Sequence, residues 1–231
     1  MDFTELWAGG PKYACSEDVF PLTVDSILLA DFAPGKHVRR VLDIGCGSGI
    51  IGLLIAWSNR ATHVTGVDIS ESAVVCARDN LELNSLGARF KVLCGDIKSV
   101  ELSDDSFDLA VCNPPYFEKG RGKSGGTARE ESSATLRDIM ERVAKLLRPG
   151  GVFCLVLRTE RLAEALAALT ELEFSPARLR QVQHTAISAP SMVLLEAWRG
   201  VTTELEVMPP LILKDENGCD SGEIKRIYHM D

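Results

Sequence analysis

Residues 41–56 read VLDIGCGSGIIGLLIA, and this stretch decides the fold. A short apolar run ends at three closely spaced glycines, Gly45, Gly47 and Gly49, and an apolar helical pattern follows. A strand that turns through glycines into a helix is typical of a βαβ unit with a nucleoside-binding turn. Glycines allow the tight turn and let a ligand approach the backbone without meeting a Cβ. The stretch predicts a parallel sheet with a ligand site where this strand ends.

Short apolar runs and helical patterns keep alternating after this stretch, which favours an α/β domain with a mostly parallel sheet. Helices are predicted at 25–32, 134–147 and 159–170, where apolar residues recur at helical spacing. Seven strands are predicted, at 41–45, 63–68, 90–94, 107–113, 152–157, 179–183 and 192–198. We therefore expect a seven-stranded sheet with helices on both of its faces.

Length and composition agree with one globular domain carrying short appendages. The 231 residues are 45% hydrophobic and 25% charged, which is average for a soluble protein. The organisation predicted is an N-terminal segment, 1–40, that covers the ligand site, a main domain, 41–200, that carries this site, and a tail, 201–231, packed on that domain. The first residues lack a signal-peptide pattern and no apolar run could span a membrane, so a cytoplasmic location without membrane association is expected.

Cysteines and histidines give no sign of a metal site. The seven cysteines contain no C-x-x-C pair, and the four histidines lack ligand spacing. The cysteines are therefore predicted to be reduced, small core residues, and no metal is expected. The chain is expected to be a monomer or a weak homodimer.

Charge is unevenly distributed along the chain. The net charge of −8 argues against a general polyanion binder, yet residues 119–148 carry eight bases against four acids. Such a strip permits a selective nucleic-acid substrate.

Asp68 comes 19 residues after Gly49, at the end of the second predicted strand of the βαβ unit. An acid at this position can bind both hydroxyls of a ribose. Strand, glycines, helix, strand and acid in this order favour a nucleoside cofactor over a purely structural turn. The spacing G-x-G-x-G is one residue shorter than the dinucleotide fingerprint.

DIGCGSG followed by VDIS resembles the first two motifs of the class I S-adenosylmethionine-dependent methyltransferases, which have a Rossmann-like fold. The resemblance implies S-adenosyl-L-methionine as the cofactor. It implies that Asp43 and the loop from Gly45 to Gly49 hold the methionine part and that Asp68 holds the ribose. Asp96 would bind the adenine amino group with the Ile97 backbone beside it. An N-cap on a following helix is the alternative explanation for Asp96.

Asn113-Pro114-Pro115-Tyr116 follows the fourth predicted strand, at the sheet edge where ligands bind. The tetrad resembles the NPPY motif of methyltransferases that act on planar amide or exocyclic amino nitrogens. The lone pair of such a nitrogen is delocalised, so acceptors on its hydrogens are needed to make the pair available. The Asn113 side-chain oxygen and the Pro114 carbonyl would be these acceptors, and Asn113 would also border the cofactor. Tyr116 would stack on the substrate, with Pro115 and Phe117 beside it.

NPPY by itself leaves the substrate open among a protein glutamine, a guanine or adenine in RNA, and an adenine in DNA. About 40 residues precede the first predicted strand, too few for the extra domains expected of release-factor or DNA enzymes. Motifs along nearly the whole chain, including MPPLILKDENGCDSGEIKRIY at 208–228, resemble the bacterial family that N6-methylates the adenosine beside the anticodon of a valine tRNA.

That family implies tRNA as the partner and methylation of an adenine N6. Phosphate contacts are predicted from four bases of the strip: Lys119, Arg121, Lys123 and Arg129. Glu130 stands where family members tend to have histidine, so the role of that histidine is not carried over. Three alternatives stay open: methylation of a guanine amino group in rRNA, methylation of a protein glutamine, and a non-catalytic cofactor-binding partner.

Overall fold

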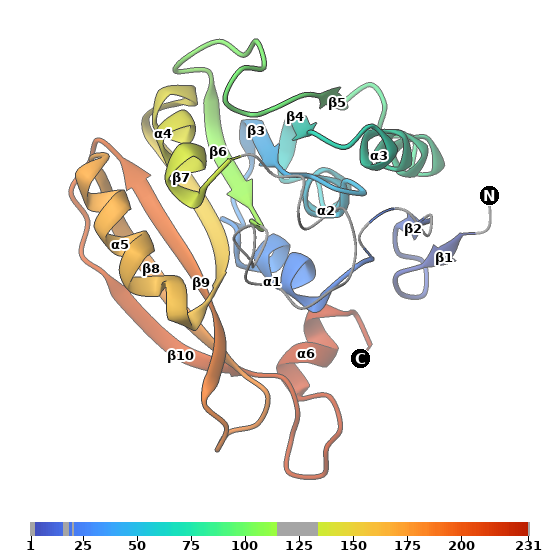
Figure 1. Ribbon diagram of the computed structural model, residues 1–231. Helices are drawn as coiled ribbons and strands as arrows, with labels where there is room; N and C mark the ends of the chain where they lie inside the picture. Colours follow the sequence, from blue (N-terminus) through green and yellow to red (C-terminus); the bar gives the residue numbers. More distant parts are fainter. Residues whose placement is uncertain (1–2, 16–18, 20, 115–133, 231) are drawn as a thin grey trace.

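The computed structural model describes residues 3–15, 19, 21–114 and 134–230 (Figure 1). Two short strands form a hairpin near the N-terminus, β1 (Thr4–Glu5) and β2 (Lys12–Tyr13). The strands of the main sheet are β3 (Val38–Ile44), β4 (Ala61–Asp68), β5 (Phe90–Cys94), β6 (Phe107–Cys112), β7 (Leu147–Arg158), β8 (Phe174–Gln183), β9 (Pro190–Arg199) and β10 (Glu206–Ile212). The helices are α1 (Val24–Phe32), α2 (Ile50–Trp57), α3 (Glu71–Leu83), α4 (Leu136–Leu146), α5 (Leu162–Glu171) and α6 (Gly222–Ile227), and a 3₁₀ turn η2 (Thr159–Arg161) precedes α5. None of the helices in these ranges is long and apolar enough to cross a membrane.

The described strands of the main sheet are ordered β10-β8-β9-β7-β6-β3-β4-β5. β9 runs antiparallel to β7 and β8, and the other neighbours are parallel. This confirms the predicted α/β class and all seven predicted strands. The carboxyl ends of β3, β4, β5 and β6 meet at one edge of the sheet, which is where such sheets bind ligands.

The predicted number of seven strands is wrong, because the sheet of the described residues has an eighth strand, β10, at its edge. Pro209 and Pro210 lie inside β10. Because proline cannot donate a ladder hydrogen bond, the two prolines argue against a strand in the sequence, and β10 was not predicted. The strand is tolerated because it pairs only with β8 and its register shifts between Met208 and Leu211. Both prolines therefore lie at an irregularity on an edge strand.

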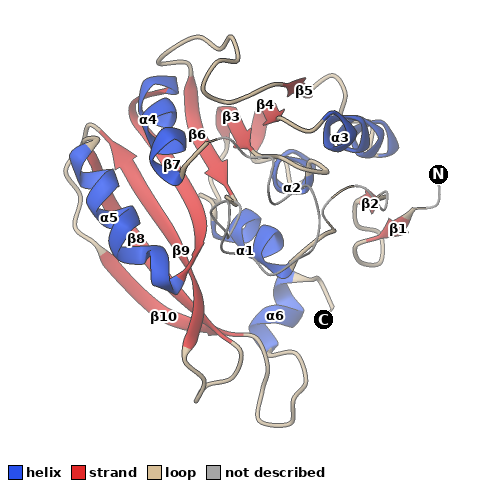
Figure 2. Ribbon diagram, viewed as in Figure 1, coloured by secondary structure: helices blue, strands red, loops and turns tan. Residues whose placement is uncertain are grey.

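Helices cover both faces of the sheet (Figure 2). Alternate residues of β7 point to opposite faces: Val152 and Cys154 pack with α1, α2 and α3, whereas Phe153 and Leu155 pack with α4 and α5. α6, from the C-terminal tail, joins the first of these layers. The two hydrophobic clusters give the three-layer arrangement expected of a doubly wound α/β domain.

α4 begins and ends for identifiable reasons. Thr135 caps its N-terminus in a reciprocal capping box with Asp138, which satisfies backbone N–H groups of the first turn. The sequence predicts that the helix closes at Arg148-Pro149-Gly150-Gly151. In the structure the helix leads directly into β7 at Leu147, so these helix-breaking residues lie in the first part of the strand.

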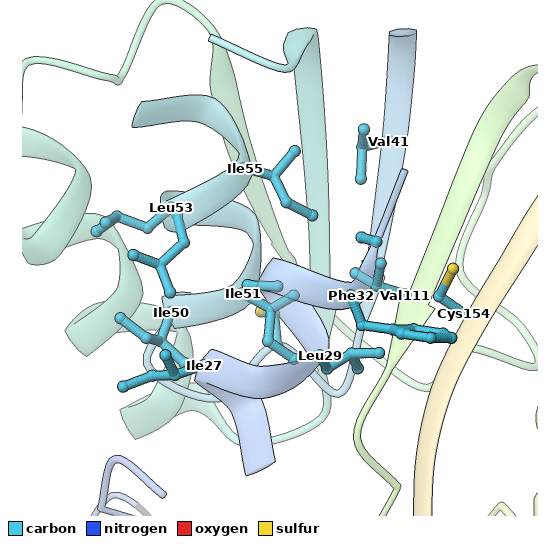
Figure 3. Close-up of a cluster of buried hydrophobic side chains, with 14 of the residues drawn as sticks. Ile27, Leu29, Phe32, Val41, Ile50, Ile51, Leu53, Ile55, Val111 and Cys154 are labelled. Carbon is cyan, nitrogen blue, oxygen red and sulfur yellow. The ribbon is translucent and has the colours of Figure 1, made fainter. Parts of the chain in front are cut away.

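α1 is held at its C-terminal end by two arginines from distant segments, Arg60 just before β4 and Arg178 in β8. Arg60 donates to the carbonyls of Ala30 at 2.7 Å and Ala33 at 3.1 Å, and Arg178 donates to the carbonyl of Phe32 at 2.9 Å. These bonds satisfy carbonyls that a helix end leaves without intrahelical partners. Figure 3 shows the apolar face of α1 packed against α2 and the sheet. The helix is therefore fixed in place by packing and by its end.

Replacing Arg178 with alanine is expected to lower the free energy of unfolding by about 3 kcal/mol. Arg178 donates through Nε to the carboxylate of Glu196 at 3.0 Å, and Glu196 is buried, so the variant leaves a buried charge without its cation. Arg226→Ala is the matched control, since it removes a largely exposed ion pair to Asp31 of α1, the helix that Arg178 also contacts. This variant is expected to lower the free energy of unfolding by less than about 1 kcal/mol. Urea unfolding of both variants measures the difference, and equal losses would contradict the account.

Candidate functional site

The turn between β3 and α2 adopts a conformation that requires its glycines. Gly45, Gly47 and Gly49 have φ values of 62°, 54° and 81°, in the left-handed region that other residues avoid. The turn is tied back to β4, because the N–H groups of Gly45 and Cys46 both donate to the Val67 carbonyl. A Cβ built on Gly45 or Gly47 would meet no described atom within 4 Å. The loop thus presents bare backbone to open space, as a ligand-binding turn does.

Asp43 lies beneath this loop and is fully buried. Its Oδ2 accepts a hydrogen bond from the Gly52 N–H at 2.8 Å, while Oδ1 has no partner among the described residues. Burial, opposed by the Gly52 bond and assisted by the charge of Asp68, raises the pKa of Asp43 to about 7. A buried carboxylate with one orphaned oxygen fits the cationic amino group of a methionine moiety, which would supply the missing charge partner.

Without cofactor, the protein is expected to lose stability between about pH 4 and pH 7 because of Asp43. The folded-state pKa lies above the unfolded value of about 3.9, so the folded state binds more protons in that window and stability falls as pH rises. Asp43→Asn does not titrate. The melting temperature of the wild type minus that of the variant should therefore fall by about 5–10 °C from pH 5 to pH 8, measured by scanning calorimetry. A difference independent of pH would contradict this environment for Asp43.

Asp68 ends β4 and contacts the glycine loop directly. Its Oδ2 accepts from the Gly47 N–H at 2.8 Å, and its Oδ1 accepts from the Ser70 N–H at 2.9 Å. The acid is thus placed beside the loop with its orientation fixed, which suits a group that binds ribose hydroxyls.

Asp96 lies just beyond β5, and β5 is the strand next to β4. The last residue of β4, Asp68, pairs with Cys94, so Asp96 is two residues past the same level of the sheet. Its Oδ1 accepts from the backbone N–H of Lys98 at 2.9 Å, and Lys98 Nζ lies 3.6 Å from Oδ2. Turns rather than a helix follow, so the N-cap alternative is replaced by a side chain that stabilises a turn. Ile97 beside it is buried.

Asn113 and Pro114 leave the sheet next to the glycine loop. The last residues of β6 and β3 pair with each other, so Asn113 follows β6 at the level where Gly45 follows β3. The Asn113 Nδ2 donates to Ser26 Oγ of α1 at 3.1 Å. Pro114 is buried. The structure therefore brings the amide of Asn113 to the same sheet edge as Asp43, Asp68 and Asp96.

Several predicted substrate residues lie outside the described residues. These are Pro115, Tyr116, Phe117, Lys119, Arg121, Lys123 and Arg129, and Glu130 lies outside as well. Their roles stay predictions.

Two buried thiols border the site. Burial raises the pKa of Cys46, and the charges of Asp43 and Asp68 raise it further. Burial and the charge of Asp43 likewise raise the pKa of Cys112. Both thiols therefore stay protonated at neutral pH and are inert small core groups.

The prediction that the cysteines are core residues is wrong for three of the seven, which are exposed: Cys15, Cys94 and Cys219.

The N-terminal segment reaches the glycine loop through contacts that sequence reasoning missed. The Tyr13 hydroxyl lies 2.8 Å from Ser48 Oγ, and burial raises the pKa of Tyr13. Asn80 of α3 joins the same two segments: its Oδ1 accepts from the Ala14 N–H at 2.8 Å, and its Nδ2 donates to the Ser48 carbonyl at 3.0 Å. Asn80 is fully buried in a helix, and a polar residue at a core-facing helical position was the only available signal.

The histidines, cysteines and acids of the described ranges form no group of three that could hold a metal ion.

Ser26 of α1 is a further residue that sequence reasoning missed, because its contact with Asn113 joins residues 87 positions apart. Asp25 precedes it in α1, and burial raises the pKa of this carboxyl, opposed by a backbone hydrogen bond and the charge of Arg158.

Comparison with known proteins extends these observations. The profile of the family described as "Methyltransferase small domain" matches residues 22–183. A curated protein of Aeromonas salmonicida, "tRNA1(Val) (adenine(37)-N6)-methyltransferase", is 32% identical over 204 residues, which are 87% of this chain and 79% of that protein. A protein of the same name from Yersinia pseudotuberculosis is 38% identical over 141 residues, but the match spans only 59% of this chain and 56% of the relative.

A solved structure from Agrobacterium tumefaciens, described as a predicted O-methyltransferase, superposes with a TM-score of 0.74. It is 22% identical and the match covers 89% of this chain and 96% of that one, so it supports the fold alone. The sequence profile and the 32% match over most of the chain reach further. Together with the glycine loop, its acids and the Asn-Pro pair, they show that this chain belongs to the methyltransferase small domain family and is an S-adenosyl-L-methionine-dependent methyltransferase.

Proposed function

We propose that the protein methylates N6 of an adenine in tRNA, at the adenosine beside the anticodon. The observation that carries the proposal is the position of Asn113-Pro114 next to the glycine loop, in a chain 32% identical over 204 residues to a tRNA1(Val) adenine(37)-N6-methyltransferase. The structural observation supports a planar nitrogen as the target. The resemblance supports adenine in tRNA.

The residues that would hold S-adenosyl-L-methionine come from three neighbouring strands. Asp43 would face the amino group, the backbone of the Gly45–Gly49 loop would lie along the methionine part, and Asp68 would bind the ribose. Asp96, with Ile97, would bind the adenine of the cofactor. The bound cofactor supplies a methyl group on a sulfonium, which an uncharged nitrogen can attack.

Asn113 and Pro114 would prepare the attacking nitrogen. The adenine amino lone pair is delocalised into the ring, so hydrogen bonds from both amino hydrogens to fixed acceptors favour a more tetrahedral nitrogen. Asn113 Oδ1 and the Pro114 carbonyl are such acceptors, and proline holds its own backbone because φ is fixed. Preorganised dipoles of this kind lower the barrier where charge develops. Methylation makes the nitrogen cationic and more acidic, so its proton leaves to water and no general base has to act first.

The target adenine would have to leave its stack, because the chemistry needs access to its Watson–Crick edge. Unpaired anticodon-loop bases cost little to extrude. Tyr116 and Phe117, with Pro115, would stack on the base. Phosphate contacts would come from the basic strip, with Lys119, Arg121, Lys123 and Arg129.

Contacts of the N-terminal and C-terminal segments support the roles proposed for residues 1–40 and 201–231. Residues 1–40 would cover the cofactor site, and the contacts of Tyr13 and Ala14 to the loop and to α3 agree with this role. Residues 201–231 supply β10 and α6, and Ile224 and Ile227 of α6 pack in the same cluster as α1. The catalytic domain would then be 41–200.

The test offers methyl-labelled S-adenosylmethionine with three substrates in parallel: total tRNA and rRNA from a strain lacking this gene, and unmethylated release factor. Label in tRNA is the expected result. Label in rRNA or in the release factor would overturn the tRNA assignment and support a guanine amino group or a protein glutamine instead. Cofactor binding without transfer to any of the three would favour a non-catalytic partner.

A further inference from the structure

We propose that Ser26 is a positioning residue that sets the orientation of the Asn113 amide for methyl transfer. The inference rests on the proposed role of Asn113 as an acceptor for the substrate amino group. It follows from one contact, the hydrogen bond from Asn113 Nδ2 to Ser26 Oγ at 3.1 Å.

The chemistry of the side chain makes orientation decisive. A carboxamide has an acceptor oxygen on one side and a donor NH₂ on the other, and rotation by half a turn exchanges them. Only the orientation with Oδ1 toward the substrate can accept a hydrogen bond from an amino group. The reverse orientation would aim a donor at a donor. By accepting from Nδ2, Ser26 Oγ leaves Oδ1 on the other edge of the planar amide group, turned away from Ser26.

The location of Ser26 makes this hydroxyl a fixed reference. Ser26 lies in the first turn of α1 and is buried, with 8% of its surface exposed. Its helix is held at the far end by Arg60 and Arg178, through bonds to three carbonyls. Leu29 and Phe32 on the same helix pack in the hydrophobic cluster (Figure 3). The helix therefore cannot shift readily, and the hydroxyl stays where Asn113 meets it.

The contact is also partly shielded from water. Asn113 is partly buried and Pro114 beside it is buried, so a hydrogen bond here competes less with solvent than one at the surface. Without the hydroxyl, Nδ2 loses its partner and the preference for one amide orientation weakens. A lost hydrogen bond of this kind corresponds to about a 10-fold change in population. We expect kcat to carry the effect, because the amide acts on the reacting nitrogen.

The experiment compares Ser26→Ala with Ser26→Thr, which keeps the hydroxyl and serves as the matched control. Alanine should lower kcat on tRNA about 10-fold, while the KM for S-adenosylmethionine and the melting temperature stay close to those of the wild type. Threonine should restore most of kcat. On an Asn113→Ala background, Ser26→Ala should cause no further loss in single-turnover transfer of label, since the group it orients is gone.

An unchanged kcat in Ser26→Ala would overturn the inference. So would a loss that persists undiminished on the Asn113→Ala background, because Ser26 would then act by another route. If the threonine variant does not fold, the alanine variant and the double variant decide between these outcomes. Failure of the wild type to form N6-methyladenosine is a separate result that overturns the proposed function, whereas wild-type transfer with a fully active Ser26→Ala overturns only this inference.

Discussion

Asn113→Ala is expected to lower kcat for methyl transfer by about 100- to 1000-fold, the usual cost of removing one preorganised polar group from a reacting centre. The variant loses the acceptor for the substrate amino group, and the Pro114 carbonyl cannot replace it. The dissociation constant for S-adenosylmethionine should change by less than about 10-fold, because the acids and the glycine loop that would hold the cofactor are untouched. Single-turnover transfer of labelled methyl and calorimetric binding of the cofactor separate the two effects.

Asn217→Ala is the matched control for this variant. Asn217 is exposed in the turn before α6, and the described hydrogen bonds there use its backbone rather than its amide. Its kcat should equal that of the wild type. If Asn113→Ala retained more than about a tenth of the wild-type kcat, the amide could not be the group that prepares the nitrogen.

Asp68→Ala is expected to weaken binding of S-adenosylmethionine at least about 100-fold. Two hydrogen bonds from ribose hydroxyls to a carboxylate would be lost, and each bond to a charged group contributes about 1.5–3 kcal/mol. The variant also removes the 2.8 Å hydrogen bond from the Gly47 N–H to Asp68 Oδ2, so the loop loses a contact that fixes its shape. Isothermal titration with S-adenosylmethionine and with its demethylated product measures the loss.

Glu101→Ala controls for the removal of one acidic charge, since Glu101 is exposed and lies outside the sheet edge that carries the site. Its cofactor affinity should match that of the wild type. Because the ribose contact does not depend on the methyl group, Asp68→Ala should weaken both ligands about equally. A loss confined to one ligand, or no loss at all, would contradict the ribose role.

The elements of the sheet could be predicted because their patterns are local. Strands such as β4 and β5 appear as short apolar runs between turn signals, and the glycines of the loop have the left-handed backbone that makes them necessary. β10 could not be predicted, since Pro209 and Pro210 argue against a strand unless its edge position and register shift are known. That information depends on the tertiary structure.

In the candidate site, too, some residues could be predicted from local sequence patterns and others depend on the tertiary structure. Asp68 and Asp96 could be placed at this edge from the sequence, because one ends and the other follows a predicted strand of a parallel sheet and such ends share one edge. Asp43 lies inside the predicted strand 41–45, and its role was implied only by the resemblance to the methyltransferases. The orphaned Oδ1 of Asp43 and the Ser26–Asn113 bond could not be placed. They depend on which side chains from distant segments come into contact, and no local pattern encodes that.

The position of the transferred methyl group tests the proposed function most directly. Total tRNA from a strain lacking this gene is incubated with the protein and labelled S-adenosylmethionine, cut with a guanosine-specific ribonuclease, and the labelled fragment is sequenced by mass spectrometry. We expect N6-methyladenosine beside the anticodon of a valine tRNA, formed by the wild type and lost with Asn113→Ala. Label on a guanine, label elsewhere in the tRNA pool, or undiminished transfer by Asn113→Ala would contradict it.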